Sequence, residues 1–214
     1  MESFDVMSVA KAIPRRQSSS TKQLFLDALE NPVAFNDATK SRTNLVKDMT
    51  IENPTVSPGS TKSFSKFAPG TWRIVYAPHI STMGKLAQGS FDPVLYILEP
   101  NGEMISHARY DFPIIGSGWL SVSGTYSSQD EDRYCRVDFD KAWVTLNGDD
   151  IDRRPYQNLD SVPPSFGKDL INAIGKFFFI DTVSIFPVSY LDQDTIVFDF
   201  ELLGTRIVAR KIFT

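Results

Sequence analysis

Apolar and polar residues alternate along most of the chain after residue 70, and this two-residue period predicts β-strands. Turn residues separate the alternating runs. Pro100-Asn101-Gly102-Glu103 gives the strongest hairpin signal, because Asn-Gly readily adopts the positive φ values of a tight turn. Residues 78–92, with Pro78, Gly84 and Gly89, are expected to form a long loop. The expected strands are 71–77, 93–99, 103–111, 118–127, 133–145, 181–190, 195–202 and 205–213.

Consecutive hairpins favour an up-and-down barrel over a sandwich, because closing the sheet removes its exposed edges. A barrel of about eight strands has an interior just wide enough for side chains and one small ligand. We therefore expect a mainly β protein. Its core is a closed antiparallel up-and-down barrel of about eight strands, lipocalin-like in shape, with an N-terminal helix and one inserted helix.

Helical spacing of apolar residues replaces this alternation in two segments. Ser20 or Thr21 is a suitable N-cap for a helix that ends at Asn31-Pro32. A second helix is predicted over 166–178, where six apolar residues share one face. A weaker helical signal covers 37–47.

These elements divide the chain into three parts. Residues 1–19 are expected to be a disordered tail or the remnant of a targeting segment. Residues 20–69 hold the N-terminal helix and a Pro/Ser-rich connector over 50–69, and residues 70–214 form the barrel.

Composition narrows the range of partners. The chain has 214 residues and a net charge of −4, so it lacks the basic surplus that nucleic-acid binding by phosphate contacts requires. Its single cysteine, Cys135, excludes an internal disulfide. No run of apolar residues is long enough to predict a membrane-spanning helix. Residues 8–22 are basic, Ser-rich and free of acids, which is typical of an organelle transit segment as well as of a plain disordered tail.

Aromatic residues on the predicted strands either fill the core or line a cavity. The small residues Ser121, Ser123 and Gly124 on the fourth strand favour a partly vacant interior. An apolar cavity with a few polar groups is the usual form of a small-molecule site. Nine aromatic residues on the predicted strands are candidates for these roles, and Trp143 is one of them. The other eight are predicted to contact a ligand: Trp72, Tyr76, Tyr96, Tyr110, Trp119, Phe139, Phe198 and Phe200.

Four polar residues are candidates for the mouth or lid of the barrel: His79, Arg109, Arg206 and Arg210. His79 follows the first strand, where it either meets a ligand head group or is an ordinary loop residue. Arg206 and Arg210 share one face of the last strand, and either could stack on an aromatic ring of the first strand as a cation–π lid.

The alternation also places Ile105, His107, Arg109 and Asp111 on one face of the third strand, and we expect that face to meet solvent. If it faced the interior instead, the arginine would need an anionic partner. With two histidines in the chain and no metal-ligand spacing, we predict neither a catalytic nor a metal site.

Several of these features occur together in a known family. A helix at Leu24–Pro32 precedes Gly70-Thr71-Trp72-Arg73-Ile74-Val75-Tyr76, and Ser189-Tyr190-Leu191-Asp192-Gln193-Asp194 precedes a last strand with two arginines. Over residues 20–214 the chain resembles the plastid lipid-associated proteins, or fibrillins, and more loosely the lipocalins. The resemblance implies a plastid location, in the stroma or on thylakoids, and a lipid, carotenoid or quinone as the bound molecule, with no other cofactor. It also implies that Trp72 closes the barrel, with Arg210 or Arg206 as its partner.

Three functions remain open at this point. The first is non-enzymatic binding of a hydrophobic or amphipathic molecule inside the barrel. The second is a structural or assembly role for a filled barrel, which would meet a membrane or a membrane-protein complex through its surface and the Phe177–Ile180 patch. The third is a lipid- or pigment-modifying enzyme that uses His107, Arg109 or Asp111 for acid–base chemistry.

Overall fold

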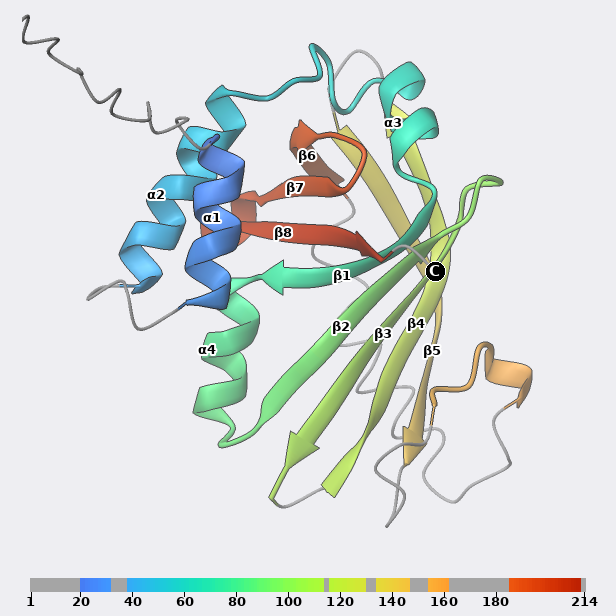
Figure 1. The fold of residues 1–214 in the computed structure, drawn as a ribbon. Coiled ribbons are helices and arrows are strands. Elements are labelled where there is room, and N and C mark those ends of the chain that lie inside the picture. The colour runs from blue at the N-terminus through green and yellow to red at the C-terminus, as the bar shows by residue number, and fades with distance from the viewer. Residues whose placement is uncertain are drawn as a thin grey trace, which may run out of the picture.

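Eight antiparallel strands form a closed barrel in chain order, and β8 pairs with β1 to complete it (Figure 1). This computed structural model describes residues 20–31, 38–113, 116–129, 134–146, 154–161 and 185–212. The predicted fold class is thereby confirmed, and each described strand agrees with its predicted range to within a few residues. The strands are β1 (Gly70–Tyr76), β2 (Ser90–Leu98), β3 (Glu103–Phe112), β4 (Gly116–Gln129), β5 (Tyr134–Leu146), β6 (Ile185–Leu191), β7 (Thr195–Phe200) and β8 (Thr205–Ile212).

The wall of the barrel is uneven in height. The β4–β5 ladder runs from Gly118↔Leu146 to Gln129↔Tyr134, whereas β1 and β2 pair only from Gly70↔Leu98 to Arg73↔Leu95. The β5–β6 ladder is also short and ends at Arg136↔Ile185. Strands β2 to β5 therefore extend as a broad curved sheet beyond the region where all eight strands surround the core (Figure 1).

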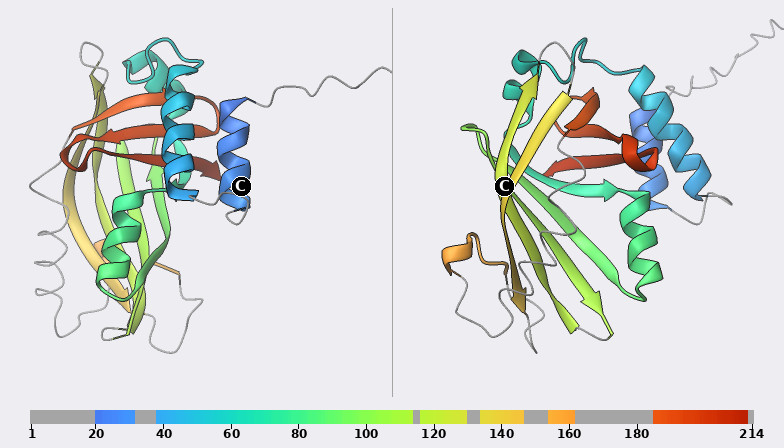
Figure 2. Two further views of the ribbon diagram at one scale, coloured as in Figure 1. Left: turned by 90° about the vertical axis from the view of Figure 1, so that its left-hand side faces the viewer. Right: turned by 180° about the vertical axis from the view of Figure 1, so that it is seen from behind.

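Two helices cover the outer face of the barrel beside β1, β7 and β8 (Figure 2). α1 (Thr21–Glu30) begins at the predicted N-cap, where the Ser20 hydroxyl accepts a hydrogen bond from the Gln23 amide. α2 (Ala38–Ile51) is longer than the weak helical signal indicated. Together the helices and strands bury an outer core of Phe25, Leu26, Val46, Met49, Tyr190, Val197 and Val208.

Two expected loops contain helices. The Pro/Ser-rich connector includes α3 (Thr61–Phe67), which Ser60 caps and which buries Phe64 in the main core. The expected loop over 78–92 is mostly α4 (Pro78–Leu86), followed by the start of β2. Pro78 suits the first turn of a helix, because that position needs no amide hydrogen bond.

Short 3-10 turns cover Leu159–Ser161 (η2) and Glu201–Leu203 (η3). The predicted tail 1–19, the predicted helix 166–178 and the Phe177–Ile180 patch lie outside the described residues.

Candidate functional site

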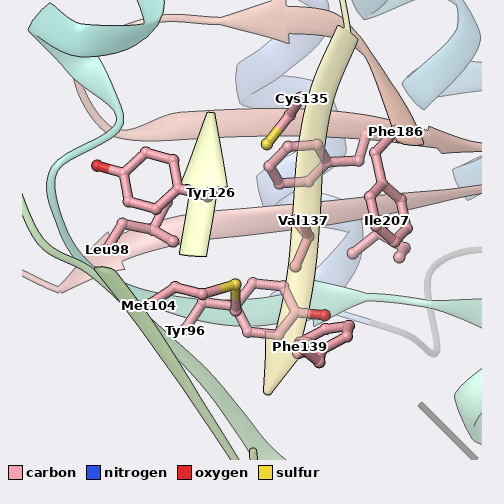
Figure 3. Close-up of a pocket in the computed structure, with 10 residues that line it drawn as sticks. Tyr96, Leu98, Met104, Tyr126, Cys135, Val137, Phe139, Phe186 and Ile207 are labelled. Carbon is pink, nitrogen blue, oxygen red and sulfur yellow. The ribbon is translucent and has the colours of Figure 1, made fainter. Parts of the chain in front are cut away.

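The interior of the barrel contains a chamber of about 50 Å³. Side chains from β2 to β8 surround it, and Figure 3 shows their rings and aliphatic groups converging on one space. Of the predicted ligand-contacting residues, Tyr96, Phe139 and Phe198 lie here. The described lining consists of Tyr96, Leu98, Met104, Tyr126, Cys135, Val137, Phe139, Phe186, Phe198 and Ile207.

Strand alternation explains this lining. Cys135, Val137 and Phe139 follow one another at every second position of β5. A register shift between Ser123 and Gly124 interrupts the alternation farther along β5. As a result Ala142, three residues after Phe139, pairs with Val122 and is buried on the inner face. Gly124 is required at the shift, because a Cβ there would lie 2.2 Å from the Asp138 carbonyl oxygen.

No described lining residue of the chamber is charged, and the polar groups among these residues are held neutral. Desolvation raises the pKa of Tyr96 and that of Tyr126 to about 12 each. Burial likewise raises the pKa of the Cys135 thiol to about 12, so this thiol is protonated and unreactive at neutral pH. The Tyr126 hydroxyl donates to the Glu99 carbonyl oxygen at 2.6 Å. The described lining therefore suits an apolar group and contains no acid–base pair.

Trp72 is fully buried in the same core. Its indole N–H donates to the Ala68 carbonyl oxygen at 2.7 Å. The cation over its ring belongs to Lys211, whose Nζ lies 4.8 Å from the ring centroid and donates to the Phe67 carbonyl oxygen.

The predicted arginine partners of Trp72 are therefore wrong. Lys211 is its direct cross-strand neighbour, and side chains directly opposite on antiparallel strands share a face. Arg206 and Arg210 are at odd spacing from Lys211 and so point outward. Arg206 forms an ion pair with Asp199 at 2.7 Å. The alternation Ile207, Ala209, Lys211 is the sequence signal that identifies the inner face of β8.

Three further aromatic residues are not at the chamber. Alternation from Trp72 predicts that Tyr76 points inward, but a register shift between Ile74 and Tyr76 turns it outward. There its ring meets that of Phe25 in a T-shaped contact at 5.9 Å, and its hydroxyl lies 2.7 Å from the Thr43 hydroxyl. Trp119 and Trp143 also face outward on β4 and β5, within an outer cluster around His107.

Tyr110 and Phe200 occupy the inner side away from the chamber lining. Tyr110 is buried on β3, and a Cβ added to the facing Gly118 would lie 2.6 Å from its hydroxyl oxygen. Phe200 packs against the main core and stacks on Phe186 at 6.1 Å.

His107 was expected on a solvent face, but it is buried beneath an outer layer. Its Nδ1 lies 2.8 Å from the Ser121 hydroxyl, and its ring lies edge-on to Trp119 and Trp143. Desolvation lowers its pKa to about 4. Segment 154–161 adjoins this layer, since the Trp143 indole donates to the Tyr156 carbonyl oxygen at 2.9 Å.

The same alternation directs Arg109 and Asp111 outward with His107. The three residues named for acid–base chemistry therefore do not converge on the barrel interior. Ser121 and Ser123 point outward as well, so their small size does not add space to the barrel interior.

His79 lies on α4 instead of in a loop. Its Nδ1 is 3.1 Å from the Thr205 hydroxyl, and its ring is 4.9 Å from that of Phe200. Burial lowers its pKa below the usual value. It sits beside the β7–β8 turn, half-buried, at one rim of the barrel.

No protein-family model matches this chain, and no curated protein is significantly similar to it in sequence. Among the described residues, no group of three or more His, Cys, Asp or Glu side chains could hold a metal ion. A helix of the length and apolarity needed to cross a bilayer is likewise absent from the part of the chain that the structure describes.

Proposed function

We propose that this protein is a non-enzymatic binding protein that takes up a hydrophobic or amphipathic molecule through the interior of its barrel. The observation that carries the proposal is the apolar chamber at the centre of a closed barrel, lined by ten described residues without a charge. Apolar surface that leaves water for such a chamber gains roughly 25 cal/mol per Å² before ordering costs.

The chamber volume limits how the molecule binds. Drug-sized ligands occupy pockets of roughly 300–1,000 Å³, and the chamber has about 50 Å³. We therefore propose that one narrow apolar end of the ligand enters, and that flexible lining side chains such as Met104 move to admit more of it. A lipid, carotenoid or quinone tail has this form. The resemblance to the plastid lipid-associated proteins accords with such a ligand and with a plastid location.

The small volume also supports a second candidate, a barrel filled by its own side chains. Such a protein would act through its surface on a membrane or a protein complex. The two candidates differ in whether the interior takes up an added apolar molecule.

Titration of delipidated protein with diphenylhexatriene tests the proposal, because this neutral probe becomes fluorescent in apolar surroundings. We expect saturable binding by the wild type and at least about tenfold weaker binding by Val137→Phe, which fills the chamber. Asp138→Asn changes the exposed neighbour on the same strand and is the matched control. Absence of saturable binding by the wild type would favour the filled barrel, and equal binding by Val137→Phe would place the probe outside the chamber.

A further inference from the structure

A second hollow, of about 570 Å³, lies where β1 and β2 separate. The ladder between these strands ends at Arg73↔Leu95, and beyond that pair β1 leads into α4, which returns the chain to the start of β2 (Figure 1). Residues of α1 and α2 form the other side. We call this hollow the wedge groove. Its volume lies within the roughly 300–1,000 Å³ range of ligand sites.

One wall of the wedge groove is apolar. Ile74 from β1, Ile80 from α4, and Phe91 and Val94 from β2 line it, and Ile74 and Ile80 also pack against the main core of the barrel. Val94 is buried, and the other three are half-buried. This wall can cover a hydrocarbon chain but cannot by itself choose among apolar ligands.

The described lining of the groove also includes three arginines. Arg73 and Arg210 are directly opposite each other in the β1–β8 register, an arrangement in which like charges repel. The third, Arg42, donates from Nε and Nη2 to the Ala28 carbonyl oxygen at 3.2 and 3.1 Å.

Arg210 is the least satisfied of the three. Its Nη2 lies 3.9 Å from an Asp194 carboxylate oxygen, at the outer limit of an ion pair. Its Nε is buried and has no hydrogen-bond partner among the described residues. A buried donor without a partner costs about 1–3 kcal/mol. The Arg210 side chain as a whole is 40% exposed, so an anion held in the groove can approach it.

Charge indicates the kind of anion. Glu30 and Asp92 also line the groove, and Asp92 pairs with Arg73 at 3.1 Å. Among the described lining residues, three arginines and two carboxylates leave a single positive charge in excess. One monoanionic carboxylate balances this excess, whereas a dianionic phosphate exceeds it. A guanidinium also matches the two oxygens of a carboxylate geometrically.

We propose that the wedge groove binds a single-chain amphiphile that carries one carboxylate, such as a fatty acid. Its hydrocarbon chain lies along Ile74, Ile80 and Val94, and its carboxylate accepts hydrogen bonds from Arg210. The site lies outside the barrel chamber and shares no described lining residue with it. The proposal therefore does not depend on uptake by the barrel interior.

Calorimetric titration with laurate, dodecanol and acetate tests the proposal. We expect laurate to bind at least about tenfold more tightly than dodecanol and acetate not to bind measurably. Arg210→Met should weaken laurate about tenfold and leave dodecanol unchanged. Arg206→Met is the matched control, because Arg206 lies on the same face of β8 but outside the groove, and it should change neither affinity.

Two further variants separate the groove from the chamber. Ile80→Gln should weaken laurate and dodecanol by similar factors, because it changes only the apolar wall. Val137→Phe, which fills the chamber, should leave laurate binding unchanged. The proposal is overturned if Arg210→Met and Arg206→Met have equal effects, if dodecanol binds as tightly as laurate, or if Val137→Phe abolishes laurate binding. That last result would instead support fatty-acid binding in the barrel interior.

Discussion

Replacing Trp72 by alanine tests how the main core of the barrel is held together. The side chain is fully buried, its indole N–H donates to the Ala68 carbonyl oxygen, and Lys211 lies over its ring. Truncation of a buried Trp costs about 3–5 kcal/mol. The carbonyl left without its donor adds to this cost, and such a hydrogen bond contributes about 1 kcal/mol. We therefore expect the free energy of unfolding to fall by about 5 kcal/mol.

Thermal unfolding measures this loss. For domains of about 150–250 residues, each 1 kcal/mol shifts the melting temperature by roughly 2–4 °C, so Trp72→Ala should lower it by about 10–20 °C. Trp72→Phe keeps most of the buried ring and loses only the N–H and part of the area, so it should cost about 1–2 kcal/mol. A Trp72→Ala shift of less than about 2 °C would refute the placement of this residue in the main core.

Three other predictions concern stability. Because His107 titrates near 4 in the folded state and near 6.5 when unfolded, the unfolded chain takes up its proton first as the pH falls. In urea unfolding the wild type should therefore lose about 3 kcal/mol between pH ~6.5 and pH ~4 that His107→Gln does not lose, and parallel pH profiles would contradict this. Gly118→Ala puts a Cβ 2.5 Å from the Thr145 carbonyl oxygen and should cost about 1–3 kcal/mol in the same assay, while the outward-facing control Ser117→Ala should stay within about 0.5 kcal/mol. Ser20→Ala removes the N-cap of α1 and should cost about 1 kcal/mol, whereas Ser20→Asp should remain near wild-type stability; equal effects would mean that the cap contributes nothing.

The strands could be predicted from the sequence because one face of each meets the core and alternation records this directly. The Asn101-Gly102 turn also follows from local chemistry, and Gly102 has φ +88°. α3 and α4 were missed because each is short and lies among Pro, Ser and Gly residues, whose local preferences resemble those of loops.

The candidate site was less predictable. A single register shift after Ile74 reverses the face of Tyr76, and nothing in the residue types marks that shift. Trp119 and His107 were misassigned for a different reason. Alternation along a strand separates the barrel interior from the outer face, and an outer face is normally expected to meet solvent. Here part of the outer face is buried as well, beneath an outer layer. That outer layer involves segment 154–161, which is remote in sequence.

The wedge groove depends on where the β1–β2 ladder ends, which is set by the tertiary course of both strands. Its arginines come from three separate elements, α2, β1 and β8, so no local motif records it. The cation at Trp72, by contrast, could have been identified, because Lys211 continues the inner alternation of Ile207 and Ala209.

Methyl NMR of the methionines tests the central proposal most directly. Met104 lines the barrel chamber, Met49 is buried between the helices and the outer face of the barrel, and Met83 is exposed on α4. On addition of diphenylhexatriene to delipidated protein, the Met104 methyl signal should shift saturably and show contacts to the probe, while the Met49 signal stays in place. A Met104 signal that stays unchanged while the probe binds would contradict uptake by the barrel interior. Failure of the probe to bind at all would contradict it as well.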